Sequence, residues 1–196
     1  MINEVYEYTL DDDFQIVSTS SNWDSFAVEN QGEACTTDRV VGKLLWEFVQ
    51  GESVRLFLQV ILMYCRESGQ TLTFDCRRDS PDARRFFVQS VEYSENDGFI
   101  IRHRLENLYR PEAGPKVIKI TEFLQRNRCS NCGSIKLPDG WVDIFSFTSE
   151  SVDISGYEIC EACRESIASQ QKVHGTKELF RNTQISPHPN SLEKNQ

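Results

Sequence analysis

The sequence of 196 residues lacks the long apolar run of a membrane-spanning helix. No window approaches about 18 uninterrupted apolar residues. The start, MINEVYEYTLDDDF, also lacks the basic and apolar regions of a signal peptide. We therefore expect a cytoplasmic protein with no membrane partner.

Short motifs typical of enzymes and signalling output modules are also missing. The chain has no P-loop, no Gly-x-Ser-x-Gly motif and no His-Glu-x-x-His motif. It has no kinase, nucleotide-cyclase or helix-turn-helix pattern and no internal repeat. These absences favour a binding protein and argue against an enzyme.

Basic residues are scarce in the first half of the chain. Residues 1–108 hold 19 acidic and 10 basic side chains, whereas residues 109–196 hold 11 of each, so the formal net charge of −9 comes from the first half. An acidic domain repels the phosphate backbone of nucleic acids. We therefore do not expect residues 1–108 to bind nucleic acid, and the neutral second half leaves that question open.

The apolar pattern of residues 1–108 predicts an α+β domain. VYEYTL and FQIVSTS are expected to form a hairpin, followed by short helices over residues 21–50. ESVRLFLQVILMYCRESG carries apolar residues at three- and four-residue spacing, which predicts a long helix that ends at Gly69. TLTFDCR, ARRFFVQSVEY and FIIRHRL then supply three antiparallel strands.

Composition divides the remaining chain into three parts. Residues 109–122, with the stretch YRPEAGPK, are interpreted as a linker. Residues 123–172 form a cysteine module, and the polar residues 173–196 are expected to be a disordered tail. VIKITEFLQRNR fits either a strand or a short helix.

Seven cysteines, an odd number, fit poorly with a disulfide framework. Four of them form two Cys-x-x-Cys pairs separated by 27 residues, namely Cys129, Cys132, Cys160 and Cys163. Such spacing lets four thiolates surround one ion at about 2.3 Å and leaves no position for water. We therefore expect a structural Zn²⁺ site. A rubredoxin-like iron site and a redox dithiol are the alternatives, although Arg164 stands where such an iron site usually has glycine.

The surroundings of the two pairs predict a knuckle turn at Gly133, a hairpin around Pro138–Gly140 and a helix that begins near Cys160. These parts resemble a treble-clef zinc finger. The module also resembles a cysteine-rich segment at the end of some bacterial PAS-containing signalling proteins, in which a Gly-Trp word, here Gly140-Trp141, lies between the pairs. That segment commonly has a histidine before the second pair, where this chain has Tyr157-Glu158.

Residues 5–106 resemble a PAS domain. The resemblance rests on FQIVSTSSNWDSFAVENQG, VVGKLLWEFVQGE and RRDSPDARR. It implies a five-stranded antiparallel sheet with a helical cradle, and it allows a homodimer through this domain. Flavin is not expected, because no reactive-cysteine word of the Asn-Cys-Arg-Phe-Leu-Gln type exists. Haem is not expected either, because the predicted cradle helices contain no histidine.

Three residues are candidates for contact with a small ligand. His103 is in phase with the apolar residues of the last strand, so it should point inward, either toward a ligand or toward a protein hydrogen-bond partner. Trp23 and Trp46 could line the same cavity or belong to the core. The charged turn that contains Arg77, Arg78, Asp79, Asp82, Arg84 and Arg85 could bind an anion, or it could be a solvated hairpin end.

These observations predict a small cytoplasmic signalling or adaptor protein. The PAS-like domain would sense a ligand or dimerise, and the zinc module would contact a protein partner. The alternative is a nucleic-acid-binding regulator that uses the treble clef as its reader. Four basic residues near the cysteines support that alternative, namely Arg126, Arg128, Lys136 and Arg164.

Overall fold

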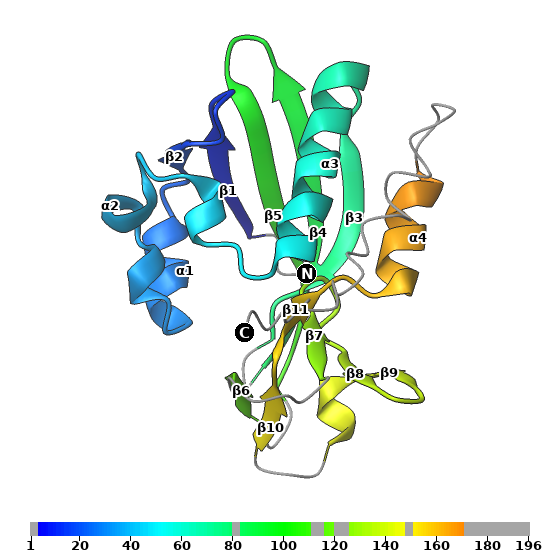
Figure 1. The fold of residues 1–196 in the computed structure, drawn as a ribbon. Helices are drawn as coiled ribbons and strands as arrows, with labels where there is room; N and C mark the ends of the chain where they lie inside the picture. The colour runs from blue at the N-terminus through cyan, green and yellow to red at the C-terminus, as the bar shows by residue number, and fades with distance from the viewer. Residues whose placement is uncertain (1–3, 80–82, 111–115, 120–125, 148–150, 171–196) are drawn as a thin grey trace, which may run out of the picture.

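The computed structural model describes residues 4–79, 83–110, 116–119, 126–147 and 151–170. Its largest element is an antiparallel sheet of five strands in the order β2-β1-β5-β4-β3 (Figure 1). The strands are β1 (Val5–Leu10), β2 (Ile16–Thr19), β3 (Leu72–Arg77), β4 (Arg84–Ser94) and β5 (Gly98–Tyr109). The predicted hairpin and the three later strands are therefore confirmed, and the last strand of the chain's first half lies at the centre of the sheet.

The helices lie between β2 and β3 in the sequence. They are α1 (Trp23–Glu29), α2 (Thr37–Val40) and α3 (Glu52–Ser68), with short 3₁₀ turns η1 (Glu33–Cys35) and η2 (Leu45–Glu47). The long helix α3 ends as predicted, since Gly69 has φ 62° and its N–H donates to the carbonyl of Cys65. In Figure 1 this helix runs across the sheet in front of β4 and β3.

One face of the sheet is buried beneath these helices. Phe57 and Ile61 of α3 pack with Phe99 and Ile101 of β5, and each is no more than 2% exposed. The opposite face is partly solvated. There Arg102 bridges Glu7 and Glu92 at N–O distances of 2.6 Å, but all three side chains are about one third exposed, so these ion pairs stabilise the sheet little.

The second half of the chain is built from short strands and one helix. The strands β6 (Lys116–Lys119) and β10 (Ser151–Ile154) pair in parallel, and β11, β7, β8 and β9 form a second sheet in that order. The remaining bounds are β7 (Asn127–Cys129), β8 (Ile135–Leu137), β9 (Gly140–Val142), η3 (Ile144–Ser146), β11 (Gly156–Glu158) and α4 (Glu161–Ser169). The predicted hairpin at 138–140 and the helix after Cys160 are both present.

The segment predicted to be a linker, residues 109–122, holds strand structure, in agreement with the strand alternative for VIKITEFLQRNR. It includes the end of β5 and the whole of β6, which pairs with residues far along the chain. The predicted tail, residues 173–196, lies outside the described residues. Within the described ranges, no helix is long and apolar enough to cross a membrane.

The two halves of the chain share one buried cluster. Ile159, Ile167 and Ala168, which flank or belong to α4, pack in the same buried cluster as α3 and the five-stranded sheet. The start of α3 also meets β11 closely. A Cβ atom at Gly51 would lie 2.5 Å from the carbonyl oxygen of Tyr157. The cysteine segment is therefore packed against the sheet and α3.

The substitution Gly51→Ala tests this close approach. Gly51 and Gly42 both have positive φ, +91° and +81°, but a Cβ at Gly42 meets nothing within 4 Å. Each alanine must therefore adopt a positive φ, which costs an L residue roughly 1–3 kcal/mol, and only Gly51→Ala adds the clash. We expect thermal unfolding of Gly51→Ala to occur several degrees below that of the Gly42→Ala control. Equal melting temperatures would contradict the packing of β11 against α3.

Candidate metal centre

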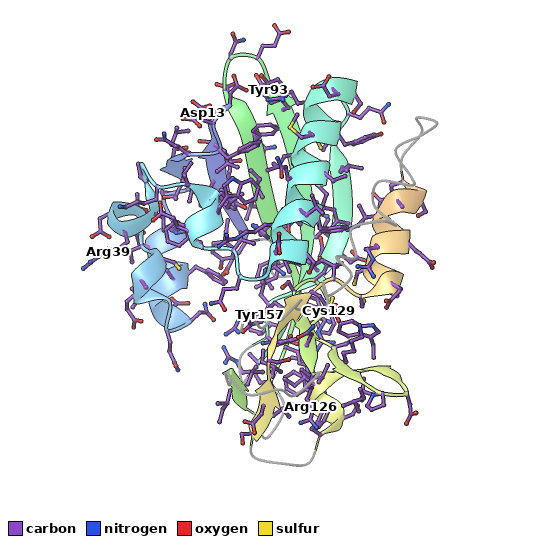
Figure 2. All side chains as sticks on the ribbon, in the orientation of Figure 1. Asp13, Arg39, Tyr93, Arg126, Cys129 and Tyr157 are labelled. Carbon is purple, nitrogen blue, oxygen red and sulfur yellow. The ribbon has the colours of Figure 1, made fainter. Side chains whose placement is uncertain are left out.

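Two separate elements carry the four predicted cysteine ligands. Cys129 is the last residue of β7, and Cys132 lies in the turn that follows. Cys160 caps the N-terminus of α4, and Cys163 lies in its first turn. Because β7 and β11 pair in parallel with Cys129 opposite Glu158, the two pairs are brought to the same end of the small sheet. Figure 2 shows Cys129 at the junction between this sheet and the larger one.

The four sulfur atoms converge. All Sγ atoms lie within 4.8 Å of one another. The Sγ atoms of Cys129 and Cys163 are 3.9 Å apart, and those of Cys132 and Cys160 are 3.7 Å apart. Four sulfurs at about 2.3 Å from a central ion would be about 3.8 Å apart in a regular tetrahedron. The cluster therefore has the dimensions to hold a metal ion such as zinc.

Neighbouring polar groups favour negative charge on the sulfurs. The backbone N–H of Cys160 donates to Cys129 Sγ over 3.3 Å, and the side-chain amide of Asn131 donates to Cys163 Sγ over 3.4 Å. Ser134 Oγ lies 3.3 Å from Cys132 Sγ. Hydrogen bonds of this kind and the N-terminus of α4 both stabilise thiolates.

The crowded sulfurs also affect one another's ionisation. Hydrogen bonds from the thiols of Cys129, Cys160 and Cys163 hold the pKa of Cys132 below its ordinary value. The same contacts raise the pKa of Cys163, because a thiol that donates to a neighbouring thiolate keeps its proton. Four thiolates at this separation need a cation to offset their mutual repulsion.

Asn131, between the first two cysteines, joins the metal site to β3. Its backbone carbonyl accepts from Arg77 N–H at 2.7 Å, and its side-chain amide donates to the Asp75 carbonyl at 2.9 Å as well as to Cys163 Sγ. It is only 8% exposed. Sequence reasoning missed this residue, since asparagine is common in any tight turn and nothing local indicates a distant strand as its partner.

A half-buried arginine makes a second contact between the two halves. Arg77, at the end of β3, forms ion pairs with Asp79 and, at 2.6 Å, with Asp143 of the cysteine segment. Although burial opposes both shifts, the ion pair raises the pKa of Arg77 and lowers that of Asp143. Removal of either Arg77 or Asp143 would leave the charge of the other poorly solvated where the two halves meet.

The other predicted site residues separate into two places. Trp23 and His103 line a cavity of about 400 Å³, whereas Trp46 packs in the core against Phe14, with ring centroids 5.3 Å apart. The His103 ring stacks on Tyr8, and no hydrogen bond to it is present among the described residues. Burial, with a smaller contribution from Arg78, lowers the pKa of His103 to about 3, so it is neutral at pH 7.

The four basic residues near the cysteines do not form one surface. Arg164 is buried and pairs with Glu161, and Lys136 pairs with Glu158 at 3.0 Å. Arg128 lines the cavity. Arg126 lies toward the far end of the small sheet, away from Cys129 (Figure 2). This arrangement offers no continuous basic patch to a nucleic acid among these residues.

Comparison of the chain with protein-family models, curated proteins and solved structures gave no match. The metal centre is therefore interpreted from its own geometry.

Replacing one ligand should empty the site. We expect Cys163→Ser to lower metal content well below one ion per chain and to lower the melting temperature, because a three-sulfur shell binds the ion weakly and leaves the segment poorly held. Elemental analysis and thermal unfolding measure both effects. The control Cys35→Ser, at a half-buried cysteine outside the cluster, should keep its metal. Full occupancy in Cys163→Ser would show that this residue is not a ligand.

Asn131→Ala should weaken both folding and metal binding. It removes two side-chain hydrogen bonds of a buried group, which we expect to lower the free energy of unfolding by about 1–3 kcal/mol. Loss of a contact to a ligand should reduce metal affinity roughly tenfold or more. Denaturant unfolding measures the free energy of unfolding, and competition with a chelating dye measures the metal affinity. Ser130→Ala is the matched control, because no hydrogen bond to the Ser130 hydroxyl exists among the described residues. If the two variants have the same free energy of unfolding and the same metal affinity, the Asn131 side chain does not connect the metal site to the sheet.

Proposed function

We propose that this chain is a small signalling or adaptor protein in which a PAS-like domain, residues 1–108, is coupled to a structural zinc module, residues 123–172. The observation that carries the proposal is the direct contact between the cysteine segment and the sheet. Asn131 connects Cys163 to β3, and Arg77 of β3 pairs with Asp143 of the cysteine segment. Because these two residues connect the halves, a change in the sheet can alter the surface of the module.

The sensing role rests on architecture and on a cavity. A five-stranded antiparallel sheet with helices packed on one face is what the resemblance to PAS domains implies. The cavity of about 400 Å³ at the buried face falls within the range of small-molecule sites. Homodimerisation through this domain is the other use that the resemblance allows.

The module is proposed to be structural for a chemical reason. Four cysteine sulfurs complete a tetrahedral shell, so a bound Zn²⁺ would have no open position for a substrate. The knuckle at 129–133, the hairpin β8–β9 and the ligand-bearing helix α4 are the parts that support a treble-clef interpretation. We accordingly propose that the chain is not an enzyme.

A protein partner fits the surface beside the metal ligands. A pocket of about 710 Å³ is lined by Cys132, Cys160 and Cys163 together with Phe86 and Trp141. Phe86 is 37% exposed, and Trp141 is held by a hydrogen bond from its indole N–H to Glu161. Aromatic side chains placed at a concave surface are typical anchors for an apolar side chain of a partner protein.

Native mass spectrometry of the freshly purified chain tests the metal and the assembly together. We expect one Zn²⁺ per chain and a mass that reports monomer or dimer. A chain that binds no metal even when zinc is supplied during expression would overturn the zinc module. An iron mass with a visible absorption band would replace zinc by the iron alternative.

The partner role is tested by comparing the proteins captured by the zinc-loaded wild type, by Trp141→Ala and by Val17→Ala. Proteins that bind the wild type should be lost with Trp141→Ala and retained with Val17→Ala, whose side chain is exposed on the distant edge strand β2. Quantitative mass spectrometry of the captured proteins provides the comparison. A captured set that is identical for all three proteins would place any partner elsewhere. Salt-dependent binding of DNA or RNA would instead favour the regulator alternative.

A further inference from the structure

An excess of positive charge lines the 400 Å³ cavity of this acidic protein. The cavity lies between α1, the sheet and the cysteine segment, and four arginines line it, namely Arg77, Arg78, Arg85 and Arg128. Asp79 is the one carboxylate in the described lining, and it is already paired with Arg77. Arg78 directly follows β3 and Arg128 belongs to β7, and no ion pair to either guanidinium is present among the described residues.

Arg128 is the clearest candidate for contact with an anion. Its side chain is half-buried, yet no hydrogen bond or ion pair to its guanidinium exists among the described residues. The like charges of Arg77 and Arg78 lie near it, and Asp79, already paired with Arg77, is the nearby opposite charge. An arginine stays charged in proteins, so this group is a solvent-deprived cation with free donors.

Arg78 faces the same space in a fixed position. Its guanidinium donates to the Ser130 carbonyl at 3.2 Å and to the Gln89 side-chain oxygen at 3.3 Å. These neutral acceptors orient the group without neutralising it. Arg78 thus binds the metal knuckle and presents its charge to the cavity at the same time.

Aromatic rings also line the cavity. Trp23 and Phe26 from α1 face Phe87 of β4, and the neutral His103 ring lies edge-on to Phe87 with ring centroids 6.3 Å apart. The Trp23 indole N–H is already bound to the Cys35 carbonyl, so its ring supplies a surface and no free donor. The cavity lining thus combines cationic guanidinium groups with aromatic rings.

We infer that this cavity binds a small molecule with a planar apolar body and a carboxylate or phosphate group. The guanidinium groups of Arg78 and Arg128 would hold the anionic group, since the arginine fork matches both kinds of oxyanion in a bidentate manner. The rings of Trp23, Phe26 and Phe87 would contact the planar body. The inference deepens the proposed function, because it names the ligand class of the sensing domain.

The site also connects a ligand to the metal. Arg128 directly precedes Cys129, and Cys129, Ser130 and Gly133 of the knuckle belong to the cavity wall. A Cβ at Gly133 would lie 3.1 Å from Asp79 Oδ2, so the knuckle is already packed against the charged end. An anion bound by Arg128 would therefore act directly on β7, the strand that carries Cys129.

Isothermal titration calorimetry on the full, zinc-loaded chain tests the inference. The probes are 1-naphthyl phosphate, 1-naphthoate and the neutral 1-naphthalenemethanol, with inorganic phosphate as an anion without a body. We expect at least one naphthyl anion to bind tenfold or more tightly than both the neutral probe and inorganic phosphate. The tighter of the two anions identifies the preferred head group. Equal affinity for charged and neutral probes, or no binding of either anion at millimolar concentration, would overturn the inference.

Variants of Arg128 then test whether this residue binds the anionic group of the probe. Arg128→Met should weaken the preferred anion tenfold or more, and Arg128→Lys, which retains charge with less risk to folding, should give an intermediate loss. Arg39→Met is the control, since Arg39 is exposed on α2 away from the cavity (Figure 2). An unchanged affinity in both Arg128 variants would also overturn the inference. Metal content measured on the same samples separates this failure from failure of the zinc module.

Discussion

The buried amide of Asn131 is the contact on which the union of the two halves depends. It sits inside the first Cys-x-x-Cys turn, donates to a carbonyl of β3 and to the sulfur of Cys163, and its own carbonyl receives the N–H of Arg77. A buried amide with its partners in place is stabilising, and one without them is costly. The position of the knuckle on the sheet and the position of one metal ligand are therefore set by the same side chain.

The charge distribution follows from this docking. The end of β3 would be solvated if the first half stood alone, with its arginines hydrated. Docking of the cysteine segment brings Arg128 to this end, so several cations share a small volume in a chain of net charge −9. Asp143 and Asp79 neutralise Arg77. The cations that remain give the junction an electrostatic character opposite to that of the whole molecule.

Local sequence patterns predicted the elements whose causes are local. Three- and four-residue spacing predicted α3, alternation predicted β3 and β5, and the paired cysteines predicted a metal site. The helix, the strands and the cysteine cluster are all found in the described residues. The patterns decided less where the partner is distant. The stretch that holds strand β6 fitted either a strand or a short helix, because its ladder partner, β10, lies more than thirty residues later.

The same limit applies to the cavity. Aromatic residues at helical spacing cannot show which ring faces a cavity, so Trp23 and Trp46 were equal candidates until packing separated them. Arg128 looked like part of a basic rim, and only the docking of its strand turns it inward. Sequence reasoning proposed the ligand set of the metal centre, but it could not place that centre against the sheet.

The parallel pairing of β7 with β11 has a mechanical consequence. No tight hairpin joins two parallel strands, so nothing in their connection sets their alignment. A slip of one residue would move Cys129 by about 3.3 Å along its neighbour and carry it away from Cys160. The four-sulfur site therefore fixes the register of this ladder. Any displacement of β7 that preserves the site must carry β11 and α4 with it as one rigid unit.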